Sequence, residues 1–333
     1  MSNNIIEIRD LRIHFNTDEG VVKAVDGVSL DIKRNRTLGL IGESGCGKSV
    51  MARSILKLIE FPGKIVSGSI QYNETGEEGE AKVDICALKE RSKMLHSIRG
   101  NKIAMIFQEP MSAFGPLNTV GNQIIETIRL HQKVDKKVAK RMTVELLSDV
   151  GIPEPEQTIN AYPHELSGGM CQRVMIAMAL SCQPALLIAD EPTTAIDVTI
   201  QSQILHLIRS LKSRNKMSLL FITHDLGVIS QMADEIAVMY LGKIVEYAPA
   251  RELFSNPQHP YTRALIRSIP GMTGEITRLE SIKGNVPSPI NVPPGCVFRA
   301  RCEEKTQACD LMNDMPATVH LTEEHSVCCH KYV

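Results

Sequence analysis

The segment Gly42-Glu43-Ser44-Gly45-Cys46-Gly47-Lys48-Ser49 decides the fold of this chain. It follows the apolar run Thr37-Leu38-Gly39-Leu40-Ile41 and precedes a stretch of helical spacing that begins at Val50. A strand, a glycine-rich turn and a helix in this order form a phosphate-binding loop, whose backbone N–H groups surround the phosphates of ATP or GTP. Lys48 is expected to reach the β- and γ-phosphates, and the hydroxyl of Ser49 to bind Mg²⁺. The residues expected to touch the nucleotide are Gly42, Ser44, Gly45, Cys46, Gly47, Lys48, Ser49 and Val50.

Short apolar strands and helices alternate on the C-terminal side of this loop. The strands are expected at 102–108, 185–190 and 218–223, and the helices within 118–150, 170–181 and 198–211. Continuously apolar strands are typical of parallel sheets that are covered on both faces. The alternation therefore predicts a doubly wound α/β core.

Other segments carry antiparallel and irregular patterns. Residues 5–15 alternate as an edge strand does, and residues 21–32, with Asp26-Gly27 as a turn signal, are expected to form further antiparallel strands. The polar, glycine-rich stretch 67–84 is expected to be a solvated surface excursion.

Composition limits the classes of function. The chain has 333 residues and a formal net charge of −1, with no long basic tract, so charge gives no indication of a nucleic-acid partner. The N-terminus lacks the apolar region of a signal peptide, and no apolar run approaches the roughly 20 residues of a membrane span. We therefore expect a cytoplasmic protein that contacts a membrane only through a partner.

Five of the nine cysteines crowd the end of the chain, at Cys296, Cys302, Cys309, Cys328 and Cys329. In a reducing compartment such a cluster favours metal binding over disulfides. The segment after residue 256 is rich in proline and has poor periodicity, so a bound metal would supply stability that a small core cannot. On chemistry alone, four thiolates suit a [4Fe-4S] cluster and a zinc ion about equally.

Five stretches in this order resemble the ATP-binding subunits of ABC transporters, and the resemblance covers roughly residues 5–250. They are the phosphate loop, Gln108 as the Q-loop glutamine, Leu166-Ser167-Gly168-Gly169-Met170 as the signature sequence, 185–190 with Glu191 as the Walker B strand, and His224 as the switch histidine. Met170 stands where the family usually has glutamine. Phe15 resembles the aromatic residue that stacks on adenine; the alternative is core packing at a strand end.

The resemblance implies a mechanism. Gln108 and Ser49 would bind Mg²⁺ directly, and Asp190 would bind it through water. Glu191 would deprotonate the attacking water, while Lys48 and His224 would stabilise charge on the γ-phosphoryl group. The signature residues Ser167, Gly168 and Gly169 would hold the γ-phosphate of an opposite subunit, so that two subunits close head to tail on two ATP molecules.

The end of the chain resembles the extension carried by the dipeptide and oligopeptide branch of ABC importers, which nickel importers share. The matching stretches are His259-Pro260-Tyr261-Thr262, Val286-Pro287-Ser288-Pro289 and 295–302. This resemblance favours a [4Fe-4S] cluster on Cys296, Cys302, Cys309 and Cys329, with Cys328 as a spare. The histidines His320, His325 and His330 are expected to be solvated on the surface.

The sequence thus predicts an ABC-type ATPase at residues 1–250, with RecA-like α/β, antiparallel β and helical parts, the helical part at about 110–165. A loop-rich metal-binding extension follows at 251–333. The predicted function is the ATP-hydrolysing motor of a peptide importer on the inner face of the cell membrane. Its expected partners are two permease subunits, a second ATPase (a paralogue or itself) and, indirectly, an extracytoplasmic binding protein. The alternatives are a nickel importer, a soluble ABC ATPase on ribosomes or DNA, and a redox-regulated binding module.

Overall fold

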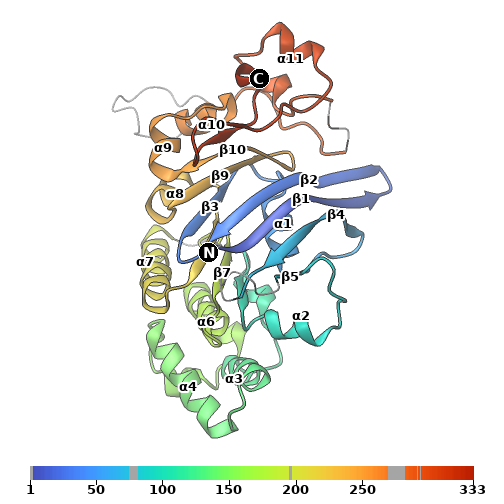
Figure 1. Cartoon of the computed structure of the whole chain (residues 1–333). Coiled ribbons are helices and arrows are strands. Elements are labelled where there is room, and N and C mark those ends of the chain that lie inside the picture. Colours follow the sequence, from blue (N-terminus) through green and yellow to red (C-terminus); the bar gives the residue numbers. More distant parts are fainter. Residues whose placement is uncertain (1–2, 75–81, 195–196, 269–281, 291, 293) are drawn as a thin grey trace. The chain divides into compact units, whose positions relative to one another are not determined.

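The computed structural model describes residues 3–74, 82–194, 197–268, 282–290, 292 and 294–333. The chain divides into two compact units (Figure 1). The first comprises Met1–Ala87 with Phe221–Val333, and the second comprises Leu88–Leu220. The predicted boundary near residue 250 is not tested by this division, and it stays a prediction. Among the described helices, none combines the length and the apolar composition that crossing a membrane requires.

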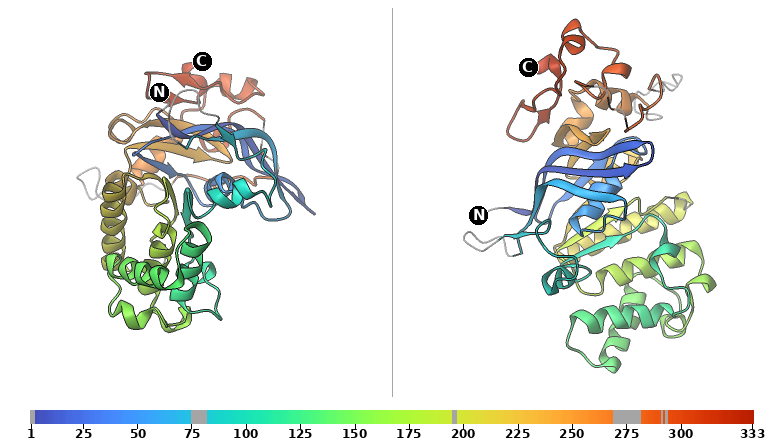
Figure 2. Two further views of the ribbon diagram at one scale, coloured as in Figure 1. Left: turned by 60° about the horizontal axis from the view of Figure 1, so that its bottom comes forward. Right: turned by 90° about the vertical axis from the view of Figure 1, so that its right-hand side faces the viewer.

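An antiparallel sheet begins the first unit, in the order β2-β1-β4-β5. Its strands are β1 (Asn4–Thr17), β2 (Gly20–Lys33), β4 (Gly63–Tyr72) and β5 (Val83–Asp84). The blue strands of Figure 2 show β1, β2 and β4 side by side. The isoleucines of β1 at 6, 8 and 13 are fully buried, so one face of this sheet contributes to the core. A strand at 5–15 is therefore confirmed, but its predicted edge position is wrong, because β1 pairs with β2 on one side and β4 on the other.

Two expectations about this sheet are wrong. The Asp26-Gly27 pair makes no chain reversal, because β2 continues through it. Gly27 has φ 82° and lies beside a register shift in the pairing with β1, so the glycine marks a bulge. The stretch 67–84 is also not a surface excursion throughout, since residues up to Tyr72 belong to β4 and pair with β1. Residues 75–81 of that stretch lie outside the described residues.

A second group of strands in the first unit carries the phosphate loop. Strand β3 (Thr37–Ile41) pairs in parallel with β9 (Glu235–Tyr240), and β10 (Lys243–Pro249) pairs antiparallel with β9. The short strands β12 (Ser326–Val327) and β11 (Val319–His320) extend the order to β11-β12-β10-β9-β3. Strands β11 and β12 of the C-terminal region therefore extend the sheet that carries the phosphate loop.

Helices accompany these strands in the first unit. They are α1 (Lys48–Ile55), α8 (Leu226–Met232), α9 (Ala250–Ser255), α10 (Pro260–Arg267) and α11 (Gln307–Leu311). Figure 1 shows α9 and α10 beside β10. Helix α8 packs on β3 and α9 packs on β10, so these two helices cover part of the sheet.

The second unit is mainly helical. It contains the parallel strands β6 (Ile103–Ile106) and β7 (Leu186–Asp190). Its helices are α2 (Lys93–Ile98), α3 (Val120–His131), α4 (Lys136–Asp149), α5 (Pro155–Thr158), α6 (Gly168–Leu180) and α7 (Val198–Asn215). The green and yellow helices of Figure 2 are this group. Strand β8 (Ser218–Ile222) spans the boundary between the units.

Local sequence explains where these helices begin. Thr119, Asp135 and Asp197 each cap a helix by accepting a hydrogen bond from the N–H group three residues later. The cap at Asp135 divides the predicted helical stretch 118–150 into α3 and α4, which pack against each other. The predicted helices at 170–181 and 198–211 are confirmed as α6 and α7.

Candidate functional site

The phosphate loop between β3 and α1 needs its glycines. Gly42, Gly45 and Gly47 have φ of 154°, 78° and 103°. A Cβ atom on Gly42 would lie 2.1 Å from the carbonyl oxygen of Met239, and one on Gly47 would lie 2.0 Å from that of Ala24. A Cβ atom on Gly45, by contrast, would meet no atom of the described residues within 4 Å. The loop is therefore packed tightly at both ends and open in the middle, where phosphates would enter.

Lys48 is the buried cation of this loop, with 5% of the residue exposed. Its Nζ donates hydrogen bonds to the carbonyl oxygens of Gly42, at 2.8 Å, and Glu43, at 3.0 Å. Helix α1 starts at Lys48 after Gly47, and no side chain caps it. Its first turn includes Ser49 and Val50, and the N-terminus of a helix favours a bound anion. Of the remaining predicted contacts, Ser44 is exposed and Cys46 is buried.

Phe15 lies near the end of β1 and is half-buried. It pairs with Gly63 on β4, and a Cβ atom on Gly63 would lie 2.6 Å from Cε1 of Phe15. The glycine thus gives the ring room to lie against the neighbouring strand. Both earlier interpretations of Phe15, stacking on adenine and core packing, agree with this half-buried position. His224 follows β8 and is exposed, just before Asp225 caps α8.

In the second unit, Gln108 and Glu191 come together after β6 and β7. Nε2 of Gln108 lies 3.5 Å from Oε2 of Glu191, and Oγ1 of Thr194 donates to the same oxygen at 2.8 Å. Glu191 adopts φ 47°, a left-handed conformation that is rare for glutamate. Such backbone strain is concentrated at functional sites. Asp190, one residue earlier, ends β7 and is fully buried.

The signature residues begin helix α6. Oγ of Ser167 accepts a hydrogen bond from the N–H of Met170 at 3.3 Å, which makes Ser167 the N-cap. A Cβ atom on Gly168 would meet nothing within 4 Å, and Ser167 and Gly168 are exposed. Gly169 is half-buried, and a Cβ atom there would lie 3.3 Å from Cγ2 of Ile200. The start of α6 is thus an accessible helix N-terminus.

The four cysteines predicted to bind a cluster lie around one small cavity in the first unit. Cys296, Cys302, Cys309 and Cys329 line it, together with His259 and His330. Burial raises the pKa of Cys296 to about 11, and the nearby thiols of Cys329, Cys302 and Cys309 contribute to the increase. Within the described ranges, however, no group of three or more histidine, cysteine or acidic side chains has the arrangement of a metal site. The prediction of a metal-binding extension is therefore not confirmed.

Two histidines at this cavity have ring nitrogens that find no hydrogen-bond partner among the described residues. Nδ1 of His259 accepts from the N–H of Tyr261 at 3.1 Å, so in the neutral ring the proton is on Nε2, which has no partner in the described part of the chain. Burial lowers the pKa of His259 to about 3, which keeps that ring neutral. Both ring nitrogens of His330 are also buried, with no partner within the residues that the structure describes. These nitrogens leave unused hydrogen-bonding capacity at the cavity.

The expectation that the three C-terminal histidines are solvated is wrong for His325 and also for His330, whose buried ring nitrogens are described above. His325 is 1% exposed and not solvated, because its ring nitrogens lie 2.9 Å from Oε1 of Glu246 and 2.8 Å from Oε1 of Glu252. Glu246 also accepts hydrogen bonds from the N–H groups of Gln258 and His259. His325 therefore ties the C-terminal region to β10 and α9. His320, as expected, is exposed.

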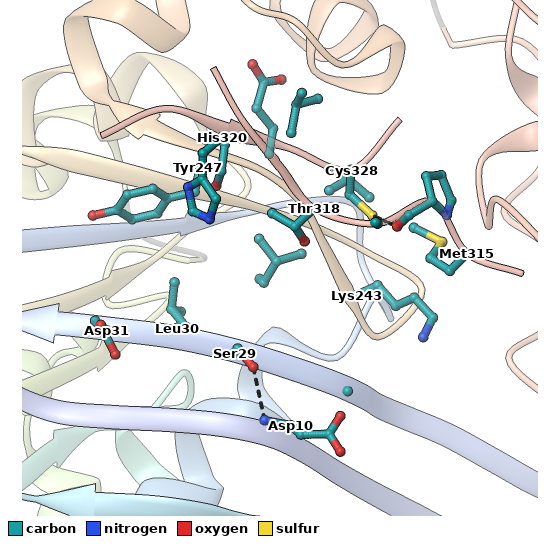
Figure 3. Close-up of a pocket in the computed structure, with 18 of the residues that line it drawn as sticks. Asp10, Ser29, Leu30, Asp31, Lys243, Tyr247, Met315, Thr318, His320 and Cys328 are labelled. Carbon is teal, nitrogen blue, oxygen red and sulfur yellow. Dashed lines mark hydrogen bonds between the residues drawn. The ribbon is translucent and has the colours of Figure 1, made fainter. Parts of the chain in front are cut away.

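A larger cavity in the first unit was not predicted. Figure 3 shows it between the strands that carry Asp10 and Ser29, the start of β10 at Lys243, and a C-terminal segment that includes Cys328. Its basic side chains already pair with carboxylates, as Lys243 does with Asp26 at 3.0 Å. The remaining basic side chains that line it, Arg9, Arg12 and Lys33, are paired as well. We assign it no ligand.

Comparisons with known proteins cover both parts of the sequence. A family model described as ABC transporter matches residues 25–194, and one described as the oligopeptide/dipeptide transporter C-terminal region matches residues 245–309. The oligopeptide transport ATP-binding protein AppD of Bacillus subtilis is 47% identical over 308 residues, which are 92% of this chain and 91% of AppD. The dipeptide transport ATP-binding protein DppD of Haemophilus influenzae is 44% identical over 326 residues, 98% of this chain and 95% of DppD.

A solved structure shares the fold. It is the dimeric ATP-binding cassette MJ0796 in a post-hydrolysis state bound to ADP and Pi, with a TM-score of 0.64 and 24% identity. The match covers 74% of this chain and 99% of the cassette. The α/β fold predicted around the phosphate loop is therefore confirmed.

Proposed function

This chain belongs to the ABC transporter family of ATP-binding proteins, and we propose that it hydrolyses ATP to drive the import of dipeptides or oligopeptides. The observation that carries the proposal is that similarity extends through both the ATPase core and the C-terminal region. The relatives it matches over nearly their whole length are named for oligopeptide and dipeptide transport. The alternative is a nickel importer of the same branch, whose cargo would be nickel instead of peptides.

The chemistry of hydrolysis would be divided among the predicted residues. Lys48 and the N–H groups of the phosphate loop would hold the β- and γ-phosphates. Glu191 would take a proton from the attacking water, with Gln108 and Thr194 fixing its carboxylate. His224 and Lys48 would stabilise charge on the γ-phosphoryl oxygens.

The bound Mg²⁺ would neutralise phosphate charge and orient the γ-phosphoryl group. Ser49 and Gln108 would hold it directly through their hydroxyl and amide oxygens, and Asp190 would hold it through water; such oxygen atoms are the hard ligands that Mg²⁺ prefers. Phe15 would stack on the adenine.

A pair of chains would complete each ATP site. The exposed N-terminus of α6, with the N–H groups of Gly168 and Gly169, suits the γ-phosphate of ATP on a partner subunit. The shared fold with a dimeric cassette supports this arrangement. Met170 lacks the amide of the usual glutamine, so we expect the contact across the pair to rest on Ser167 and the two glycines. The second ATPase would be a paralogue or another copy of this chain.

The membrane contact would be made by permease subunits docking on the second unit. Met111 and Leu117, which closely follow Gln108, are 50% and 88% exposed. Exposed apolar side chains next to a residue that contacts the catalytic carboxylate would link permease movement to hydrolysis. The protein would thus be held on the inner face of the membrane by its partners, with an extracytoplasmic binding protein delivering the peptide.

The cysteine cavity would hold a [4Fe-4S] cluster. Four thiols lie around one cavity, and the unpartnered Nε2–H of His259 can donate to an anionic group there. The donor set fits such a cluster, and zinc is the alternative metal. Bound through Cys296, Cys302, Cys309 and Cys329, the cluster would cross-link the loop-rich C-terminal region.

Capture in the native cell tests the proposed function. The Glu191→Gln chain, trapped with ATP and recovered from solubilised membranes, should bring two polytopic subunits, a second ATPase and a peptide-binding protein. A nickel-binding protein in that place would change the cargo. Ribosomal proteins or nucleic acid without a permease would instead support a soluble ABC ATPase, and would overturn the transporter assignment.

A further inference from the structure

We propose that Arg301 and Tyr261, both from the C-terminal region, position the phosphate loop for ATP hydrolysis by holding Glu43. This inference rests on the ATPase role proposed above. It gives the C-terminal region a part in the nucleotide chemistry. Neither the family description of that region nor its cysteines indicate such a part. All the residues involved lie in the first unit.

Arg301 holds the side chain of Glu43. Its Nη1 donates to Oε2 of Glu43 at 2.6 Å, and its Nη2 donates to Oε1 at 3.0 Å. The arginine side chain is 5% exposed and that of Glu43 is 25% exposed, so this two-point ion pair is partly shielded from solvent, with the arginine on the buried side. Because both guanidinium nitrogens are engaged, the pair fixes the orientation of the carboxylate as well as its distance.

The arginine is itself anchored. Its Nε donates to the carbonyl oxygen of Lys283 at 3.1 Å, and its Nη1 lies 3.3 Å from the hydroxyl of Tyr240. The guanidinium carbon lies 5.9 Å from the centre of the Tyr240 ring. Glu43 is therefore bound to an arginine whose own position is fixed by these further contacts.

Tyr261 holds the backbone of the same residue. Its hydroxyl accepts a hydrogen bond from the N–H of Glu43 at 2.9 Å. The ring is fully buried and packs edge-on against the ring of Tyr240, with ring centres 4.7 Å apart. It also packs at a tilt against the ring of Phe298, with centres 5.2 Å apart. An aromatic cluster of this kind has little freedom to move.

Lys48 connects this clamp to the phosphates. Its Nζ donates to the carbonyl oxygen of Glu43, so Glu43 is held at its N–H, its side chain and its carbonyl group. A shift of Glu43 would shift the ammonium group that must meet the β- and γ-phosphates. Misplacement of a catalytic group by about 1 Å can lower a rate about a hundredfold. Arg301 and Tyr261 are thus positioning residues that act through Lys48.

Conservative substitutions separate positioning from folding. Tyr261→Phe removes only the hydroxyl, and Arg301→Lys keeps the charge but not the two-point contact. We expect each to lower kcat/KM for ATP hydrolysis by the purified full-length chain about tenfold, consistent with losing one or two buried hydrogen bonds. The matched control is Tyr332→Phe, whose hydroxyl lies in the same region and donates to Oε1 of Gln258 at 2.7 Å instead of bonding to Glu43. It should leave kcat/KM unchanged.

A double-mutant cycle tests whether Arg301 acts through Glu43. If it does, Glu43→Gln with Arg301→Gln should lose no more activity than the worse single variant. Full additivity, or wild-type kcat/KM in the folded Tyr261→Phe and Arg301→Lys chains, would overturn the proposal. An equal loss in Tyr332→Phe would also overturn it, because the effect would then be general instability.

ATP binding is measured in parallel by equilibrium dialysis. It distinguishes a failure of the positioning proposal from a failure of the proposed function. If the wild-type chain binds ATP without hydrolysing it, a tenfold weaker affinity in the two clamp variants still supports positioning, and an unchanged affinity contradicts it. If the wild-type chain neither binds nor hydrolyses ATP, the proposed function fails and the clamp fails with it.

Discussion

The amide Nε2 of Gln108 lies 3.5 Å from the carboxylate Oε2 of Glu191. Both residues belong to the second unit, and they are 83 positions apart in sequence. The same oxygen accepts a hydrogen bond from Thr194. Two neutral donors orient this carboxylate without neutralising its charge, as a general base requires. Hydrolysis and binding should therefore respond differently to changes here.

Gln108→Ala tests this contact. We expect kcat for ATP hydrolysis to fall about tenfold or more, because the carboxylate loses one of its orienting donors, while ATP affinity changes less than about twofold. Phosphate release and nucleotide binding measure the two effects. Gln157→Ala, at an exposed position on α5, is the control and should behave as wild type. Equal losses of binding and turnover would place Gln108 in nucleotide binding instead.

Alanine substitutions of two phosphate-loop glycines should have different effects, one on stability and the other on ATP affinity. Gly42→Ala would push a methyl group to 2.1 Å from the carbonyl oxygen of Met239, so we expect the chain to unfold at a clearly lower temperature. Gly45→Ala meets open space, and its left-handed φ costs about 1–2 kcal/mol. That methyl group would occupy the space for phosphates, so ATP affinity should fall by more than about tenfold while the fold persists. Thermal unfolding and equilibrium binding check both; normal ATP affinity in Gly45→Ala would contradict the assignment of the open space.

Iron analysis tests the cysteine cavity. Chain purified without oxygen should contain iron and acid-labile sulfide, and Cys302→Ala should lose most of both because one thiolate ligand is missing. Cys328→Ala is the matched control, since its Sγ donates to the carbonyl oxygen of Pro316 at 2.8 Å and does not line that cavity. Zinc in place of iron would show that the cavity binds a zinc ion and not a [4Fe-4S] cluster. No metal in the wild-type chain would remove the site.

His325→Ala should destabilise the C-terminal region. Glu246 is buried, and removing the histidine takes away a partner of its carboxylate, so we expect a loss of about 3 kcal/mol in the free energy of unfolding. Denaturant unfolding measures this, with the exposed His320→Ala as the control. Equal stability of both variants would show that the contacts of His325 contribute little.

Features that depend on neighbouring residues in sequence were predictable. The phosphate loop, the apolar strand ending at Asp190 and the capped helices α3 and α4 all follow from local patterns. Strand β4 was missed because polar residues alternate along it, and only its pairing with β1 shows that it belongs to a sheet. A short polar alternation cannot be told from a loop without knowing its partner strand.

Contacts between distant residues were not predictable. Arg301 and Glu43 are 258 positions apart, and neither residue type indicates a partner. His325 resembles a surface histidine in sequence, and its burial depends on Glu246 and Glu252 from other elements. The candidate site was thus predictable where a motif carries it. The surroundings that hold the motif in place required the structure.

Phosphate release by the purified chain and its Glu191→Gln variant tests the account most directly. We predict that the wild-type chain hydrolyses ATP with Mg²⁺, and that the variant loses about a hundredfold or more in rate while binding ATP as tightly. Glu156→Gln, at an exposed position on α5, should match wild type. Unchanged hydrolysis in Glu191→Gln would remove Glu191 from the role of base, and a wild-type chain that binds no ATP would contradict the account as a whole.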